Sequence, residues 1–465
     1  MPLGGWSQWT GLSRRSGYEG RCSAERIQLR RRKHAGAWPG GEVVRAIDMR
    51  NGSTERRVVI TGMGVISPSG KDLKTLWSNV RGGVSAAAPV TRFDASRLPV
   101  KIGAEVKDFN VAEFIQSRKP GRFDLTIQYG VAAATLAVED AGIDLGSLDE
   151  NRVGVVEGTT TSGEGSIIKM HESYAGGENN FRAIHPYHAV SSYCGEGSST
   201  ISLHLGIRGT AMTFCSGCAS GSDAIGQGMR MIRNDDVDVV VAGGAEGTFE
   251  LVHAAFCRLR AMTEHNGSPA GAMRPFDRTR DGFLLGEGAA FFVLEEMSHA
   301  LGREARIYAE IAGHGQSCEA YHSTDPHPDG EGYVRAMEKA LHEARLHPSE
   351  VNYINAHGSA TPLNDPVETK AVKRVFRHHS KRLAISGSKP IFGHLMGASG
   401  AIEAMVCALA LWHQEIPPTI NLTEPDPDCD LDYVPGAARE YPVQVAMNLN
   451  AGFGGRYACL ALRKF

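Results

Sequence analysis

Two cysteines lie three positions apart in the stretch TFCSGCASGSDAIGQGM, residues 213–229, among glycines, serines and alanines. Cys218 stands where a predicted strand gives way to a predicted helix. The unpaired N–H groups and positive partial charge of a helix N-terminus stabilise a thiolate, and small neighbours leave room for an oxyanion hole. The stretch therefore favours Cys218 as the nucleophile of an acyl transfer.

Cys215 lies on the strand side of the same turn and is expected to point into the core. A Cys-x-x-Cys redox pair or half of a zinc site would need matching ligands elsewhere in the chain. The sequence contains no second pair of this spacing, so no metal site is predicted.

Two histidines follow predicted strands in glycine-containing loops. His357 lies in NAHGSATPLND, and His394 lies in KPIFGHLMGASG, a turn that is similar in pattern to the cysteine turn. A single histidine is more often structural, but two at equivalent strand ends facing Cys218 favour proton transfer or hydrogen-bond donation. Lys389, five residues before His394, is placed to hold a positive charge beside them. Phe453 lies between glycines in NAGFGGRY and is expected to act as a plug or a gate.

The order of predicted elements from residue 57 onward occurs twice. The strand and loop VGVVEGTTTSG has a counterpart in VNYINAHGSATP, and the cysteine turn has one in AISGSKPIFGHLMGASGAIEA. Such internal repetition predicts two similar α/β halves, about 57–305 and 306–465, related by a pseudo-twofold axis. Their strand-to-helix turns are expected to meet at a shared central site.

Composition limits the classes of partner. The chain has 465 residues, a net charge of −3 and no evident apolar run of about 18 residues, which predicts neither nucleic-acid binding nor a membrane span. Its nine cysteines are odd in number and scattered. This pattern favours a reducing compartment, and we expect a cytoplasmic protein.

Residues 1–56 differ from the rest, because they are rich in arginine and tryptophan and have almost no periodicity. They are predicted to be a disordered extension, or an artefact of an upstream start with Met49 as the true initiator. A transit peptide is less favoured because Glu19, Glu25 and Asp48 are present.

From about Arg57 to the C-terminus, the chain resembles the β-ketoacyl-ACP synthases of the thiolase superfamily. The resemblance is carried by GCASG, NAHGSATPLND, SKPIFGHLMGASGAIEA and GFGG, and also by RPFDRTRDGFLLGEGAA and PPTINLTEPDPDCDLDYVP. Each motif alone is weak, but together and in this order they are specific. The resemblance implies a thiolase-like fold with α-β-α-β-α layers.

The resemblance also implies a decarboxylating Claisen condensation. Cys218 would accept an acyl chain from the phosphopantetheine arm of acyl carrier protein, with no bound cofactor. His357 and His394 would promote decarboxylation of a malonyl thioester and stabilise the enolate. The N–H groups of Cys218 and Phe453 would bind the thioester oxyanion.

Four further positions match the family motifs. Lys389 would hold the histidine network, and Glu403 matches a buried glutamate on the following helix. Ser359 and Thr361 stand where the family places hydroxyls that contact pantetheine.

Two departures bear on the subtype. Fatty-acid elongating synthases usually have Thr-Ala-Cys at the nucleophile and a second gate phenylalanine, whereas this chain has Ser216-Gly217-Cys218 and Ala451. Both features are more similar to the ketosynthase alpha subunits of type II polyketide systems. Ser359 replaces the family threonine and keeps its hydroxyl. The resemblance thus favours a polyketide-type or specialised synthase over a housekeeping fatty-acid enzyme, and both pathways stay open.

Three rivals are disfavoured. A thiolase uses a second cysteine as base, in contrast to the pairing of Lys389 with His394. An initiating synthase of the Cys-His-Asn kind needs asparagine at His394. A non-catalytic chain-length subunit usually lacks the cysteine that is Cys218 here.

The expected partners are acyl carrier protein and a second subunit, in a homodimer or in a heterodimer with a ketosynthase-like relative. The apolar run VDVVVAGGAEG, residues 237–247, is expected to form the exposed sheet edge at which the subunits pair.

Overall fold

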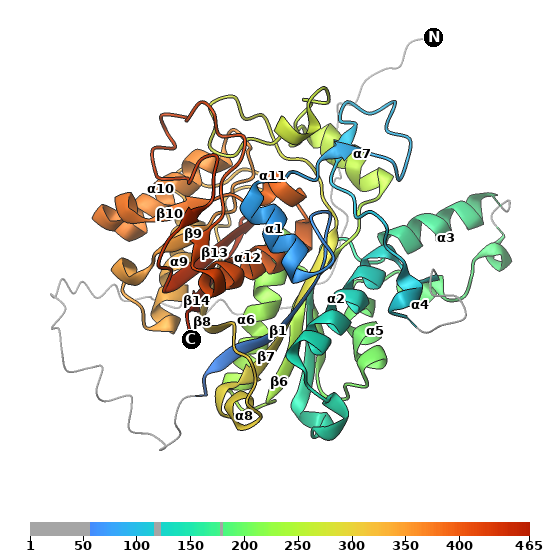
Figure 1. Ribbon diagram of the computed structural model, residues 1–465. Helices are drawn as coiled ribbons and strands as arrows, with labels where there is room; N and C mark the ends of the chain where they lie inside the picture. The colour runs from blue at the N-terminus through green and yellow to red at the C-terminus, as the bar shows by residue number, and fades with distance from the viewer. Residues whose placement is uncertain (1–55, 116–121, 177–179) are drawn as a thin grey trace, which may run out of the picture. The chain divides into compact units, whose positions relative to one another are not determined.

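The computed structural model describes residues 56–115, 122–176 and 180–465. The predicted extension, residues 1–56, lies outside this part of the chain except for its last residue. Figure 1 shows the described elements as a twisted sheet with helices on its faces and α6 and α12 near its middle.

Ten strands form one continuous sheet in the order β10-β9-β13-β14-β8-β1-β7-β6-β4-β5. The strands of the first half are β1 (Val58–Ile66), β4 (Val153–Gly158), β5 (Ala211–Phe214), β6 (Val239–Glu246) and β7 (Gly288–Glu296). Those of the second half are β8 (Ala309–Cys318), β9 (Tyr353–Asn355), β10 (Ala384–Ser386), β13 (Val445–Gly452) and β14 (Arg456–Arg463). Two small ribbons pair β2 (Ala88–Pro89) with β3 (Ile102–Gly103) and β11 (Glu415–Ile416) with β12 (Arg439–Glu440).

The internal repeat predicted from the sequence is confirmed by strand order and direction. Within the first half the order is β5-β4-β6-β7-β1, and within the second it is β10-β9-β13-β14-β8, which is the same order by position in the chain. In the sheet order just given, the first three strands of each half are parallel to one another. The fourth strand pairs antiparallel with both the third and the fifth. A short antiparallel pairing of β8 with β1 joins the halves.

Helices complete five layers, as the resemblance implied. The outer face of the first half is covered by α2 (Leu125–Ala141) and α5 (Glu196–Leu205), and that of the second by α9 (Glu331–Ala344) and α10 (Asn364–Phe376). Between the halves lie α6 (Ser220–Arg233) and α12 (Ser399–His413). The remaining helices are α1 (Leu73–Gly82), α3 (Glu164–Gly176), α4 (His188–Ser191), α7 (Glu250–Leu259), α8 (Met297–Gly302) and α11 (Lys389–Phe392).

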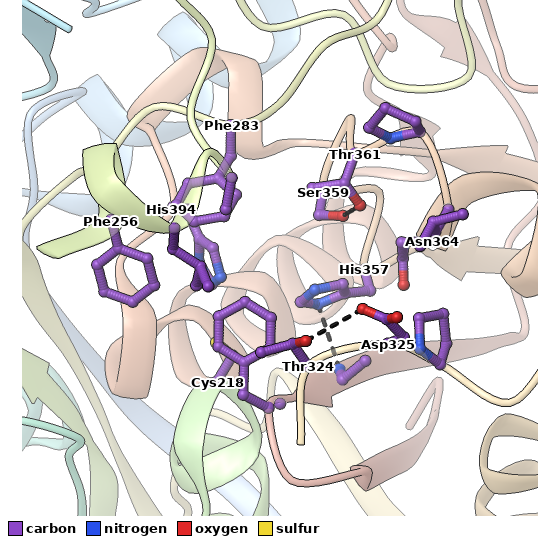
Figure 2. A pocket seen from close by; sticks show the side chains of 18 of the residues that line it. Cys218, Phe256, Phe283, Thr324, Asp325, His357, Ser359, Thr361, Asn364 and His394 are labelled. Carbon is purple, nitrogen blue, oxygen red and sulfur yellow. Dashed lines mark hydrogen bonds between the residues drawn. The ribbon is translucent and has the colours of Figure 1, made fainter. Parts of the chain in front are cut away.

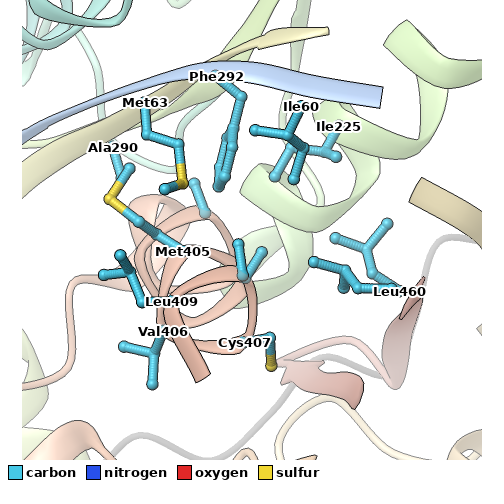
Figure 3. Close-up of a cluster of buried hydrophobic side chains, with 14 of the residues drawn as sticks. Ile60, Met63, Ile225, Ala290, Phe292, Met405, Val406, Cys407, Leu409 and Leu460 are labelled. Atoms are coloured by element: carbon cyan, nitrogen blue, oxygen red, sulfur yellow. The ribbon is translucent and has the colours of Figure 1, made fainter. Parts of the chain in front are cut away.

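The central layer holds the largest apolar core, part of which Figure 3 shows. Met405 and Leu409 of α12 pack beneath Met63 of β1 and Phe292 of β7, and all four side chains are almost fully buried. Burial of each such side chain contributes roughly 1.5–3 kcal/mol, so this layer fixes α12 firmly against the sheet.

One described stretch, Met396–His413, is long and apolar enough to cross a membrane by length and composition, although none was expected from the sequence. It is 89% buried inside the fold, where it forms the last turn before α12 and α12 itself. The stretch is apolar on all sides because it is buried on all sides, between the two halves of the sheet. Its hydropathy is therefore explained by its place in the core.

The run 237–247 does not form a sheet edge, so that expectation was wrong. It contains β6, which lies between β4 and β7 and is buried along its whole length. The edge of this half is β5 instead, a strand whose residues are exposed or half-buried. Continuous burial on both faces explains the apolar run, since α2 and α6 pack against this strand and leave it no polar face.

A fully buried carboxyl group lies on β4. Glu157 is 0% exposed, and neither of its oxygens has a hydrogen-bond partner of normal geometry among the described residues. Its side chain packs against Gly130 and Gly197, where an added Cβ would come within 3.3 Å and 2.1 Å of its oxygens. Burial, and then the nearby charge of Glu246, raise the pKa of Glu157 to about 8.

We expect this group to make stability fall as the pH rises. The folded state holds a proton on Glu157 that the unfolded chain releases near pH 4.5, so stability is full below that value and is lost up to about pH 8. Glu157→Gln should therefore be more stable than the parent at pH 8.5, by about 2–4 kcal/mol, and nearly equal at pH 4.5. Denaturant unfolding at both pH values tests this, with the exposed Glu172→Gln as the matched control. A constant difference between parent and Glu157→Gln would contradict it.

Candidate active site

A pocket with a volume of about 310 Å³ lies where the turns of the two halves meet. Figure 2 shows Cys218, His357 and His394 around it, with Ser359 and Thr361 on one side and Phe256 and Phe283 on the other. The predicted residues that line it are Cys218, His357, His394, Ser359, Thr361 and Phe453, while Lys389 and Glu403 lie behind the histidines. Thus the structure brings all eight predicted residues to one place.

Close packing of glycines brings the two helix N-termini together. A Cβ on Gly221 of α6 would lie 2.7 Å from the backbone nitrogen of Ala401 of α12. A Cβ on Gly397 would lie 2.6 Å from Thr159, in the loop after β4. Larger residues would separate the helices, so these glycines set the distance between the cysteine turn and the His394 turn.

Cys218 lies in the 3-10 turn Gly217–Ala219 that leads into α6, and it is 7% exposed. The sequence expectation of a stabilised thiolate is not met, because burial raises the pKa of the Cys218 thiol to about 12 despite the opposing charge of Lys389. The resting group is therefore a thiol, and its attack requires a proton acceptor.

Cys215 does not point into the core, contrary to expectation. It is exposed, and its Sγ lies 3.7 Å from the carbonyl oxygen of Thr160. The strand β5 ends one residue earlier, so the chain has already left the sheet at this position.

His357 follows β9 and is almost fully buried. The backbone N–H of Ala451 donates to its Nδ1 at 3.2 Å, and Lys389 Nζ lies 3.4 Å from the same atom. Nδ1 is thus the acceptor, and the neutral ring carries its proton on Nε2. Burial, then the charges of Lys389 and His394, hold the pKa of His357 well below its usual range.

His394 also carries its proton on Nε2, because other groups donate hydrogen bonds to its Nδ1. The backbone N–H of Met396 donates to its Nδ1 at 3.3 Å, and the Ser399 hydroxyl donates to it at 2.8 Å. Burial and the charge of Lys389 hold the pKa of His394 well below its usual range. The two imidazole rings lie 5.6 Å apart and nearly perpendicular, and both line the pocket. Among the described residues, no hydrogen bond engages the Nε2 of either ring, so both are placed to donate to a ligand there.

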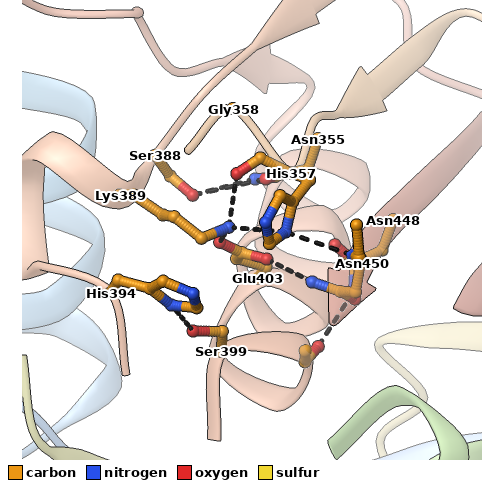
Figure 4. A network of polar contacts seen from close by, with 12 residues as sticks. Asn355, His357, Gly358, Ser388, Lys389, His394, Ser399, Glu403, Asn448 and Asn450 are labelled. Atoms are coloured by element: carbon orange, nitrogen blue, oxygen red, sulfur yellow. Dashed lines mark hydrogen bonds and ion pairs between the residues drawn. The ribbon is translucent and has the colours of Figure 1, made fainter. Parts of the chain in front are cut away.

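Lys389 connects the histidines to a buried polar network, shown in Figure 4. Its Nζ lies 2.6 Å from Glu403 Oε1 and also donates to the carbonyl oxygen of His357. Asn450 donates to the other oxygen of Glu403 at 2.6 Å. Lys389 and Glu403 are both 0% exposed, so each charge depends on the other.

The turn that carries Phe453 lies against the cysteine turn. A Cβ on Gly452 would be 3.0 Å from the backbone nitrogen of Cys218, and one on Gly217 would be 3.8 Å from that of Phe453. A side chain at position 452 would press on the cysteine turn, and Gly217 is favoured by its φ of +65° rather than by lack of space. The close approach places the N–H groups of both turns near one another. The Phe453 ring is 39% exposed and stacks on Phe256 at 6.2 Å.

Sequence reasoning missed two groups around the site. Glu246, at the end of β6, accepts hydrogen bonds from the backbone of Thr160, Thr161 and Gly397, and so ties the loop after β4 to the His394 turn. A carboxylate at the end of a buried strand is a signal that could have identified it. The pocket also includes Thr324 and Asp325, which Figure 2 shows beside His357 and which no motif marked.

Ser359 and Thr361 share a hydrogen bond of 2.9 Å between their hydroxyls on one wall of the pocket. Within the described ranges, no cluster of three or more His, Cys, Asp or Glu side chains is placed to hold a metal ion. The arrangement thus offers a buried thiol, two neutral imidazole donors and paired hydroxyls.

Comparison with known proteins places this arrangement in a family. The N-terminal domain of the β-ketoacyl synthases matches residues 55–300, and their C-terminal domain matches residues 308–423. A 3-oxoacyl-[acyl-carrier-protein] synthase 2 from Coxiella burnetii is 40% identical over 88% of this chain and 99% of its own length. The chain belongs to the β-ketoacyl synthase family. It is accordingly an acyltransferase with a thiolase-like fold.

Other relatives of this β-ketoacyl synthase include both 3-oxoacyl-[acyl-carrier-protein] synthases and a ketosynthase named for a type II PKS. The corresponding synthase 2 from Synechocystis is 39% identical over 88% of the chain. Among solved structures, the ishigamide ketosynthase/chain length factor is similar with a TM-score of 0.83 and 36% identity, over 89% of this chain and all of that one. A type II PKS ketosynthase bound to its acyl-carrier protein and a hexaketide is similar with a TM-score of 0.81 and 31% identity, over 89% and 100% of the two chains.

Proposed function

We propose that this β-ketoacyl synthase condenses an acyl group held on Cys218 with malonyl-ACP and releases a 3-oxoacyl-ACP. The observation that carries the proposal is the pair of neutral imidazoles, His357 and His394, whose Nε2–H groups are both left for one ligand beside the thiol. Two such donors suit an oxygen that becomes negative during the reaction.

In the first step, Cys218 attacks the thioester carbonyl of an acyl group on the phosphopantetheine arm of acyl carrier protein. The C–S bond to the carrier breaks, and the proton of the Cys218 thiol ends on the departing pantetheine thiol. The N–H groups of Cys218 and Phe453 would bind the oxyanion, which their closely packed turns support.

In the second step, the thioester oxygen of malonyl-ACP accepts hydrogen bonds from the Nε2–H of His357 and His394. Loss of CO2 leaves an enolate, which the two donors stabilise. The enolate carbon attacks the acyl thioester carbonyl, the new C–C bond forms, and the C–S bond to Cys218 breaks. Cys218 leaves as a thiolate and takes up one proton from solvent, which restores the thiol. Since both imidazoles are already neutral, this step needs no prior deprotonation of a histidine.

The supporting residues would act through position. Lys389 donates to the backbone oxygen of His357 and so orients that ring, while Glu403 balances its charge. The hydroxyls of Ser359 and Thr361 line the wall along which a pantetheine arm would pass, and Phe453 with Phe256 would gate the acyl side.

The proposal leaves two pathways, both in the cytoplasm. A relative named 3-oxoacyl-[acyl-carrier-protein] synthase 2 is 40% identical to this chain, and a neighbour named as a type II PKS ketosynthase is 31% identical, so both pathways stay open. Ser216-Gly217 before the nucleophile and Ala451 near the gate favour the polyketide-type alternative, in which this chain is the catalytic subunit beside a chain length factor.

Assembly would use the edge strand β5. Among the described strands it pairs on one side only, and Met212 on β5 and Leu203 on the adjacent α5 are 39% and 82% exposed. An unpaired edge beside exposed apolar side chains fits pairing with a second ketosynthase-like subunit. Sedimentation and a condensation assay on the chain alone separate the alternatives. An active homodimer supports the fatty-acid pathway, poor solubility or activity supports the heterodimer, and an active monomer would contradict both.

We expect His357→Ala and His394→Ala to impair decarboxylation much more than acylation. Loss of one oxyanion donor costs about 10²–10³ in rate, and the malonyl step uses both donors. Release of CO2 from malonyl-ACP and the mass of the acyl-enzyme measure the two steps separately. His253→Ala is the matched control, because His253 is similarly buried, its Nε2 donates to the carbonyl oxygen of Val100, and it does not line the pocket. Parental CO2 release in both variants would overturn the assigned roles.

A further inference from the structure

A buried acid–imidazole pair lies beneath the nucleophile and takes no part in the chemistry described above. Asp223 of α6 and His314 of β8 are each 2% exposed, and Asp223 Oδ1 lies 3.0 Å from His314 Nε2. The two residues come from different halves of the fold and are 91 positions apart.

Three side chains converge on the Asp223 carboxylate. Besides His314, the amide of Gln316 donates to Oδ2 at 2.9 Å, and the hydroxyl of Ser216 donates to the same oxygen. His314 and Gln316 are two residues apart on β8, so their side chains lie on the same face of the strand, the one toward Asp223 of α6. Three donors to one buried carboxylate satisfy it and fix the rotamer of each donor.

The fold makes room for the imidazole at Gly226. A Cβ at this position would lie 2.2 Å from the His314 ring, so any other residue on this turn of α6 would displace the histidine. Gly313 and Gly315, on the opposite face of β8, admit α9 at similarly short distances. Thus β8 is held between α6 and α9, and His314 has little freedom to move.

The link to the reaction is Ser216, which lies two residues before Cys218. Gly217 between them has φ of +65°, a conformation that the turn must hold to direct the Cys218 N–H and Sγ toward the pocket. The Ser216 N–H donates to Ser220 at 2.9 Å, so this residue is fixed at both its backbone and its side chain. Arg456 donates to the carbonyl oxygen of Cys215 at 3.0 Å and restrains the turn from the other side.

We propose that Asp223, held by His314 and Gln316, is a positioning residue for the nucleophile turn and acts through the Ser216 hydroxyl. The second half of the fold thereby sets the orientation of a cysteine that belongs to the first half. The proposal rests on the proposed function only for its kinetic readout, because the accessibility and reactivity of Cys218 are measurable without acyl carrier protein.

The test uses the full-length protein with Ser216→Ala, Asp223→Asn and the hydroxyl-retaining Ser216→Thr. Acyl transfer from acyl-ACP to Cys218 is followed by intact mass, malonyl-ACP decarboxylation by CO2 release, and thiol alkylation by iodoacetamide by mass. Ser380→Ala is the matched control, since Ser380 is likewise buried, at 2% exposed against 9% for Ser216, and its hydroxyl donates to the carbonyl oxygen of Arg377 far from the nucleophile turn.

We expect Ser216→Ala and Asp223→Asn to slow acylation about tenfold at saturating acyl-ACP, since a displacement of about 1 Å costs up to a hundredfold. Their alkylation rates should change as well, while decarboxylation should stay within about twofold because His357 and His394 have separate supports. Ser216→Thr should restore acylation, and Ser380→Ala should leave all three rates unchanged.

Parental acylation and alkylation in Ser216→Ala would overturn the proposal, and so would an equal loss of acylation and decarboxylation in every variant. If the parent protein takes no acyl group but Ser216→Ala still changes iodoacetamide alkylation, the proposed function fails and the positioning role stands.

Discussion

Replacement of Cys218 by alanine is expected to abolish covalent acyl loading and to lower condensation by about 10⁴-fold or more, as removal of the catalytic nucleophile does in serine proteases, which also form an acyl-enzyme. Cys218 lies just before α6 and lines the pocket beside both histidines, so it is the thiol placed to attack a thioester held there. Intact-mass measurement after incubation with an acyl-ACP detects the adduct directly.

Cys215→Ala provides the matched control for that experiment. Cys215 is the same residue type only three positions away, but it is exposed and outside the pocket lining. Its variant should retain an adduct of the parental mass. An acyl adduct that persists in Cys218→Ala would show that another thiol is the nucleophile.

The second large effect is expected at Lys389. Lys389→Ala would leave the Glu403 carboxylate fully buried, with Asn450 as its remaining hydrogen-bond partner among the described residues. Breaking a buried pair in this way typically costs about 3–5 kcal/mol, because the remaining charge has no counter-ion. The free energy of unfolding should fall by that amount, and decarboxylation should fall with it, since Lys389 also orients His357.

Two controls separate stability from catalysis. Lys381→Ala breaks an exposed pair with Asp430 and should cost less than about 1 kcal/mol. The double variant Lys389→Met with Glu403→Leu removes both charges and should recover most of the stability, but not the activity. Equal destabilisation by Lys389→Ala and Lys381→Ala, measured by denaturant unfolding, would contradict the assigned burial.

Much of the site could be predicted because its residues lie in short motifs at the ends of strands. Cys218 and His357 lie shortly after β5 and β9, and His394 lies after α11, which follows β10. Since β5 runs opposite to β9 and β10 in the sheet, these turns meet because the two halves pack together around α6 and α12. The twofold order of elements was also readable, since each half repeats the same local patterns of strand, helix and glycine turn. These features depend on neighbours within a few residues.

Other features depended on partners far apart in the chain, and the sequence carried no sign of them. The Asp223–His314 pair spans 91 positions and requires the space at Gly226. The exposure of Cys215 and the interior place of β6 were both predicted wrongly, because local hydrophobicity does not say which strand ends a sheet or where a turn leaves it.

The sequence by itself determined the repeated α/β architecture, the family and the chemical groups of the site, because residue types and spacing specify local structure and local chemistry. Only the tertiary structure decided how those groups are held: which nitrogen of each histidine carries the proton, which charge Lys389 balances, and that burial keeps Cys218 a thiol. The physical reason is that hydrogen bonding and desolvation act between groups that meet only when the two halves pack together.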